Sequence, residues 1–163
     1  MSRAHHPRLF VRSWLLLAAA ALLVLSVLLT GPGVIRAQEG GPTVTAVAVS
    51  SNAGDDDTYA KGDVIRITVT FSEAVDVTGT PLLKIDMDPA DWGEKKAAYD
   101  GGTGSTALAF AHTVVEPNLS TKGIAVLANS LALNGGTITS ASSQIPANLA
   151  HSGLAHDADH KVN

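Results

Sequence analysis

The stretch Val64-Ile65-Arg66-Ile67-Thr68-Val69-Thr70-Phe71 decides the fold. From Ile65 to Phe71 a large apolar side chain stands at every second position, and the positions between them hold arginine and threonine. This period of two is typical of a β-strand, because successive side chains on a strand point to opposite faces. We therefore expect one face of this strand to pack in an apolar core and the other to meet water.

Weaker forms of the same alternation recur on both sides of this stretch. Turn residues separate them, and Gly101-Gly102-Thr103-Gly104 joins two of them as a hairpin. After residue 37 no segment shows a sustained helical period; one helical turn at Leu127 to Ser130 is the most that the pattern allows. About seven short strands between frequent turns predict an all-β fold, a two-sheet antiparallel β-sandwich. The further expected strands are Thr45 to Val49, Leu82 to Met87, Lys95 to Asp100, Thr106 to Val115, Ile124 to Leu127, Leu131 to Leu133 and Thr137 to Thr139.

Residues 1–37 have the order of a secretory signal peptide. Arginines precede an apolar run from Trp14 to Leu29, and Gly31-Pro32-Gly33 and the small residue Ala37 follow it. The run is shorter than the roughly 20 residues that span a bilayer as a helix. We therefore expect a helical signal peptide cleaved after Ala37, with an uncleaved N-terminal anchor as the alternative. In either case residues 38–42 form a tether and residues 43–163 the folded module, outside the cytoplasm.

Charge is distributed unevenly along the chain. Of its 11 basic residues, four arginines lie within residues 1–37, which contain no acid. Seven basic and 15 acidic residues remain beyond them, a formal net charge of −8. An acidic surface repels phosphate backbones, and no basic stripe interleaved with aromatic residues is present. We therefore expect no nucleic-acid partner.

The chain contains no cysteine, and aromatic residues make up only 4% of it. Disulfides, thiolate catalysis and thiolate zinc sites are therefore excluded. The core of the module must be built from valine, isoleucine and leucine.

Eight stretches between residues 59 and 162 form a recognisable combination. They are Tyr59-Ala60-Lys61-Gly62-Asp63, Ile65 to Val75, Gly79-Thr80-Pro81-Leu82-Leu83, Ala98-Tyr99, Gly102 to Leu108, Asn129 to Gly136, Ala155-His156 and Asp159-His160-Lys161-Val162. Together they resemble bacterial immunoglobulin-like repeats, which occur in large secreted and cell-surface proteins. The resemblance covers roughly residues 43–163 and implies an Ig-like sandwich that acts as a spacer or adhesive module, often one of many in tandem.

The expected function is that of a non-enzymatic structural or adhesive module, extracellular or at the cell surface. Its expected partners are neighbouring modules, a cell-surface protein or a glycan, and a membrane only if the leader stays uncleaved. No Gly-x-Ser-x-Gly elbow is present, and no helix follows a strand to carry one, so no enzyme activity is predicted. Two alternatives stay open: a calcium-dependent or carbohydrate-binding adhesin domain, and an accessory domain of a truncated secreted enzyme.

Five carboxylates are candidate ligands for calcium, the one cofactor that the sequence suggests. Asp55, Asp56 and Asp57 occupy a single polar turn, and Asp63 and Glu73 flank the strand that decides the fold. Calcium takes about six to eight oxygen ligands, and carboxylates clustered at one end of a sandwich can supply several of them. The alternative interpretation is a solvated turn whose aspartates bond their own backbone.

Two further features have an ordinary explanation beside a functional one. His151, His156, Asp157, Asp159 and His160 are possible zinc ligands by residue type. On a strand, however, His156 and His160 would stand about 13 Å apart, so a polar final turn and strand is favoured.

Trp92, in the polar loop Asp88 to Glu94, is a candidate for stacking on a sugar. A tryptophan in such a loop more often caps the edge of the sandwich. The sequon Asn118-Leu119-Ser120 is interpreted as incidental.

Overall fold

The stretch that predicts the fold lies within β3 (Val64–Thr78), the longest strand of the protein's computed structural model. The structure describes residues 40–87 and 95–163. Ile65, Ile67 and Val69 are fully buried, and Arg66 is exposed between them. The prediction of a half-buried strand is confirmed, because its apolar face packs in the core and its polar face meets water.

Every regular element among the described residues is a β-strand, so the predicted all-β class is confirmed. Within these residues no helix is long and apolar enough to cross a membrane. The predicted signal peptide, residues 38–39 of the predicted tether and the loop that holds Trp92 lie outside the described residues. The remaining strands are β1 (Val44–Val49), β2 (Thr58–Tyr59), β4 (Leu82–Asp86), β5 (Lys95–Gly101), β6 (Ser105–Thr113), β7 (Ile124–Ala132), β8 (Thr137–Ser140), β9 (Leu154–Asp157) and β10 (Lys161–Val162).

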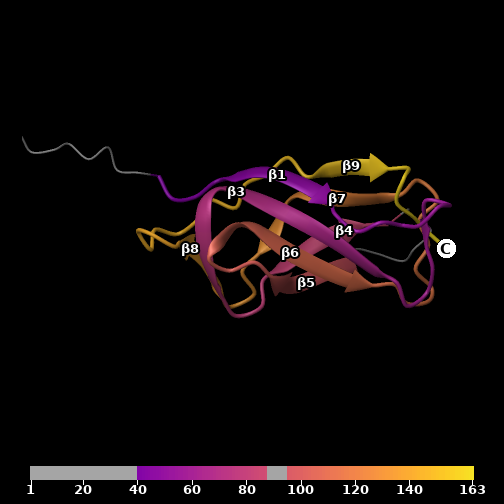
Figure 1. Cartoon of the computed structure of the whole chain (residues 1–163), viewed down its shortest axis with the longest axis horizontal. Helices are drawn as coiled ribbons and strands as arrows, with labels where there is room; N and C mark the ends of the chain where they lie inside the picture. The colour runs from indigo at the N-terminus through magenta and orange to yellow at the C-terminus, as the bar shows by residue number, and fades with distance from the viewer. Residues whose placement is uncertain (1–39, 88–94) are drawn as a thin grey trace, which may run out of the picture. The chain divides into compact units, whose positions relative to one another are not determined.

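The strands form an antiparallel sandwich in the order β1-β3-β6-β5-β4-β7-β9, with β8 paired to the far end of β3 (Figure 1). β2 and β10 form a separate parallel pair. The sequence predicts two sheets, whereas here the hydrogen bonding is continuous, because β4 pairs with both β5 and β7. The curled sheet encloses one core, to which Ile67, Phe110, Leu83 and Val126 contribute from four strands.

Two strands depart from their predicted bounds by more than two residues, β3 and β7. β3 continues beyond Phe71, and its register shifts between Thr70 and Val75. Beyond the shift it leaves β1 and pairs with β8, with Val75 opposite Ser140. Because an irregularity of this kind interrupts the alternation of side chains, the pattern of two is lost at Ser72 although the strand continues.

β7 is a single strand, where the sequence predicts two short pieces separated by at most a helical turn. Its pairing with β4 shifts between Leu83 and Ile85, and Asn129 has a φ of 53°. The residues Leu127 to Ser130 therefore form a bulge within the strand and not a turn of helix. Extra residues in a bulge disturb the apolar alternation without ending the strand.

The chain enters and leaves the sandwich at opposite ends. In Figure 1 the backbone after Gly40 begins at the left, where β1 starts, and the C-terminus lies at the right. β1 is six residues long, which is roughly 20 Å at the rise of a strand. At the far end of this length, β10 closes the chain against β2.

Candidate functional site

The acidic turn that carries three of the predicted calcium ligands satisfies its own backbone. Asn52 Oδ1 accepts a hydrogen bond from Gly54 N–H at 2.8 Å, and Thr58 Oγ1 donates to Asp56 O at 2.9 Å. The side chains of Asp55 and Asp57 are exposed. Within this turn, the side chains that bond nearby backbone are those of Asn52 and Thr58. The alternative interpretation, a turn whose aspartates bond their own backbone, stays a prediction.

The structure does not bring the other two predicted calcium ligands to this turn. Asp63 Oδ2 accepts from Ala60 N–H at 2.8 Å, which closes a local turn before β3. Glu73 lies past the other end of the regular part of β3, where Ser140 Oγ donates to its carboxylate at 3.2 Å. Among residues 40–87 and 95–163, no three His, Asp or Glu side chains are grouped so that they could hold a metal ion. The five carboxylates do not form a joint site.

The histidines near the C-terminus point to different partners. His151 faces the backbone of β7, where Ser130 N–H donates to its Nε2 at 3.1 Å. His156 Nδ1 lies 2.7 Å from Gly123 O, and its Nε2 lies 3.7 Å from Asp86 Oδ2. The segment forms β9, a turn and β10, the polar final strand and turn that the spacing favours.

Sequence reasoning missed a polar network beneath the β2–β10 pair. Tyr59 is 1% exposed, and its hydroxyl donates to Ser51 O at 3.0 Å. The same hydroxyl lies 2.7 Å from Ser51 Oγ and 3.1 Å from His160 Nδ1. Arg66 N–H in turn donates to Ser51 Oγ at 2.8 Å. All of these groups are satisfied when Ser51 Oγ–H and His160 Nδ1–H both donate to the Tyr59 oxygen.

The network is a structural connection, because its central hydroxyl has almost no access to solvent. It joins the turn after β1, the strand β2 and the turn between β9 and β10. Burial raises the pKa of the Tyr59 hydroxyl above its ordinary value, and the carboxylates of Asp157 and Asp63 add to this shift, while the hydrogen bond with Ser51 opposes it. A neutral hydroxyl can both donate and accept hydrogen bonds, so it can link the chain segments around it. In the sequence, Tyr59 stands beside Ala60-Lys61-Gly62-Asp63, and no pattern there indicates its partners.

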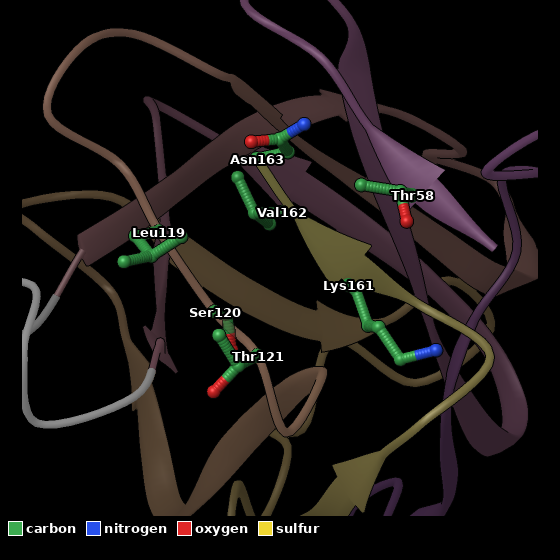
Figure 2. A pocket seen from close by; sticks show the side chains of 7 residues that line it. All are labelled: Thr58, Leu119, Ser120, Thr121, Lys161, Val162 and Asn163. Carbon is green, nitrogen blue, oxygen red and sulfur yellow. The ribbon is translucent and has the colours of Figure 1, made fainter. Parts of the chain in front are cut away.

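A depression lies beside the C-terminus, and Thr58 and Lys161 in its lining are the chain neighbours of Tyr59 and His160 (Figure 2). Its volume is ≈ 250 Å³, slightly below the roughly 300–1,000 Å³ of most small-molecule sites. Its one charged side chain is Lys161, and its apolar walls are Leu119 and Val162. The other lining residues are polar and uncharged, and residue types this common do not identify a ligand class. The complete lining is Thr58, Leu119, Ser120, Thr121, Lys161, Val162 and Asn163.

The predicted glycosylation sequon beside this depression is built into the fold. Asn118 is 6% exposed. Its Oδ1 accepts from Val115 N–H at 2.9 Å and lies 3.1 Å from His112 Nε2. A side chain that is buried and bonded in this way closes its own loop, so the interpretation of the sequon as incidental agrees with its position.

Fold and site together define a small antiparallel β-sandwich domain whose polar clusters serve its own structure. Comparison of the chain with protein-family models, with curated proteins and with solved structures found no match. The functional conclusion therefore rests on the geometry of the chain itself.

Proposed function

We propose that this protein is an exported, non-enzymatic Ig-like module of the bacterial cell exterior, which spaces or presents other surfaces. The observation that carries the proposal is the passage of the chain from one end of the sandwich to the other (Figure 1). A domain that the chain enters and leaves at opposite ends adds its length to any larger assembly. It holds neighbouring parts apart, which is the work of a spacer.

Backbone hydrogen bonds fix the chain at both ends of the sandwich. At the N-terminal end, Ser72 N–H donates to Thr43 O at 2.9 Å and Asn148 N–H donates to Pro42 O at 2.7 Å. At the C-terminal end, Val162 and Ser120 exchange two backbone hydrogen bonds of 3.0 Å. Tension on either end of the chain therefore reaches the sandwich within two or three residues.

The first strand is placed to resist such tension. A pull along the chain at Gly40 acts along β1, which is antiparallel to β3 from Val44 to Val49. The hydrogen bonds of this ladder run perpendicular to the strands, so the load falls on all of them together and not on one at a time. This arrangement supports a mechanical role.

The composition agrees with a location outside the cytoplasm. The leader has the order of a signal peptide, and the part beyond residue 37 has a formal net charge of −8 and no cysteine. A net charge far from zero favours solubility, which suits a surface exposed to water. Under this proposal the partners are neighbouring modules, a cell-surface protein or a glycan.

The test combines export with mechanics. The full chain is expressed in a bacterial host, and mass spectrometry of the product outside the cytoplasm reads its N-terminus. That product is then stretched between its two ends by single-molecule force spectroscopy. We expect a start at Gln38 and a discrete unfolding event. A cytoplasmic product, or a chain that extends without any such event, would overturn the proposal.

A pair of variants on β1 makes the mechanical measurement specific. Ala48 lies on the exposed face opposite Thr68, at a position that hydrogen-bonds to β3. Ala48→Pro removes a ladder N–H, so we expect a lower unfolding force. Ala48→Thr keeps that N–H and favours a strand, so we expect the force of the unaltered chain. Equal forces in both variants would show that this ladder does not carry the load.

A further inference from the structure

β1 is a free edge of the sandwich. It stands at one end of the strand order and pairs with β3 alone. Among residues 40–87 and 95–163, its outer side is bonded only just before the strand begins, through the Thr43–Asn148 bridge. A free edge presents unpaired backbone groups, to which another strand can add.

The direction of the free backbone groups follows from one hydrogen bond. Ser50 N–H donates to Arg66 O at 2.8 Å, so position 50 faces β3. In an antiparallel pair the bonded positions alternate, so Ala46 and Ala48 also bond to β3. The N–H and C=O groups of Val47 and Val49 therefore point away from the sheet, along the free edge.

Within the part of the chain that the structure describes, the other edges of the sandwich are protected and β1 is not. β9, at the opposite end of the order, has only four residues and carries His156 and Asp157. β8 is covered by the segment after it, because Ala147 N–H donates to Ile138 O at 2.9 Å. β1 reads Val-Thr-Ala-Val-Ala-Val, without charge or proline. Charges, short length and coverage are the usual protection of edges against strand addition.

The charge of the chain indicates what this edge accepts. Residues 40–54 contain no charged side chain, although the part beyond residue 37 carries −8. Two acidic copies repel each other, and this edge adds no charge to that repulsion. Two β1 strands that run antiparallel present the same uncharged surface to each other, as a two-fold interface requires.

We propose that the free edge of β1 pairs antiparallel with β1 of a second copy of this chain, which joins two sandwiches through a continuous sheet. Val47 and Val49 supply the backbone hydrogen bonds, and the exposed Ala46 and Ala48 lie opposite alanines of the partner. This self-association goes beyond the proposed spacer function and does not depend on it.

The test uses charge on the outward face of β1. The exported product of the full chain is studied by sedimentation velocity over about a hundred-fold range of concentration. We expect a monomer–dimer equilibrium that Ala46→Lys/Ala48→Lys weakens by at least about ten-fold, because four lysines then meet across the interface. Ala46→Glu/Ala48→Glu should weaken it equally, and an equimolar mixture of the two variants should restore a heterodimer.

The matched control is a pair of alanines on β6, which flanks Thr68 and Thr70 of β3 on the side opposite to β1. Ala107 and Ala109 of β6 pair with Thr70 and Thr68, as Ala46 and Ala48 do, but in the interior of the sheet. Ala107→Lys/Ala109→Lys adds the same charge to the same face, and we expect it to dimerise as the unaltered chain does.

Hydrogen exchange identifies the contact directly. The amides of Val47 and Val49 should become protected as the concentration rises, while those of Ala46 and Ala48 are protected throughout. A chain that stays monomeric over the whole range would overturn the proposal. Lysines on β1 that leave the dimer unchanged would overturn it too, because association would then use another surface.

Discussion

Tyr59 and His160 are 101 residues apart in the chain, yet the Tyr59 hydroxyl lies 3.1 Å from His160 Nδ1. Their rings are stacked at an interplanar angle of 16°. This contact fastens the last turn of the chain to β2, and the bond from Tyr59 to Ser51 O continues it to the end of β1. The C-terminal end of the module is held by this connection and by the few backbone bonds of β10.

The substitution Tyr59→Phe tests how much this connection stabilises the fold. It removes one donor and leaves Ser51 and His160 without their partner, so we expect unfolding to become easier by about 1–3 kcal/mol. Chemical denaturation of the exported product measures this change. Tyr99→Phe is the matched control, because the Tyr99 hydroxyl accepts from Thr103 N–H at an exposed position. We expect it to cost less than about 1 kcal/mol, and equal costs would contradict the prediction.

The same hydroxyl makes stability fall in alkali. Burial raises the pKa of Tyr59 in the folded chain above its ordinary value of 10.0. The free energy of unfolding is therefore unaffected by this group below pH 10, and it decreases as pH rises above 10, because the unfolded chain then loses this proton more readily than the folded chain. The free energy of unfolding, measured by denaturant titration between about pH 8 and 11, should fall above pH 10. Tyr59→Phe should fall less steeply over this range. Parallel curves for the two proteins would mean that other groups cause the loss.

The sequence predicts the strands better than it predicts what joins them. Alternation locates β3, β4 and β6 because each of these strands buries one face in the core. Such a strand needs an apolar side chain at every second position, and this pattern is visible in the sequence. The continuation of β3 beyond Phe71 and the bulge at Asn129 were not predictable from the sequence, because both arise from a shift of register between strands. Such a shift depends on the partner strand, so no local sequence pattern indicates it.

The candidate site shows the same limit more strongly. Asp63 and Glu73 stand at the two ends of one predicted strand, and the length of that strand is incompatible with a shared ion. The connection of Tyr59 to His160 could not be predicted, because it depends on how β10 returns to β2 across nearly the whole domain. Residue type identifies a polar side chain, whereas its partner is set by the topology.

Gly123 is a position where the topology tolerates no side chain. Its φ is +86°, and a Cβ there would lie 1.6 Å from Asp157 O, in the pairing of β7 with β9. We expect Gly123→Ala to separate these strands and to destabilise the chain by more than about 3 kcal/mol, measured by thermal and chemical unfolding. Gly135→Ala is the control, because its φ of +82° is similar but no atom lies within 4 Å of the added Cβ. That change should cost only about 1–2 kcal/mol, and an equal loss in both variants would exclude the clash as the cause.

Calcium tests the one cofactor that the sequence suggests. No three carboxylates of the described residues converge, and Asp63 and Glu73 are each bonded within their own part of the fold. We therefore expect millimolar calcium to leave the melting temperature of the exported product unchanged. An ion that binds only the folded state raises this temperature with its concentration. A rise that Asp55→Asn/Asp57→Asn abolishes would contradict this prediction and restore the turn as a site.

Acid should loosen the segment that precedes β9, through His151. Two backbone N–H groups face this ring, from Ser130 at 3.1 Å to Nε2 and from Gly153 at 3.1 Å to Nδ1. A neutral imidazole accepts at one nitrogen, and a protonated one at neither. Burial lowers the pKa of His151 below its ordinary 6.5, so its contribution to stability is present above pH 6.5 and is lost as pH falls through the lower, folded-state value.

The variant His151→Gln separates this residue from the other histidines of the chain. Glutamine can accept one of the two N–H groups but does not titrate, so the free energy of unfolding should fall less steeply below pH 6.5 in the variant than in the unaltered chain. In acid, the amides of Ser130 and Gly153 should lose protection from hydrogen exchange, relative to the intrinsic rate at each pH, in the unaltered chain only. If the free energy of unfolding falls equally with pH in both proteins, the acid response comes from other groups. His151 then holds its segment by packing alone.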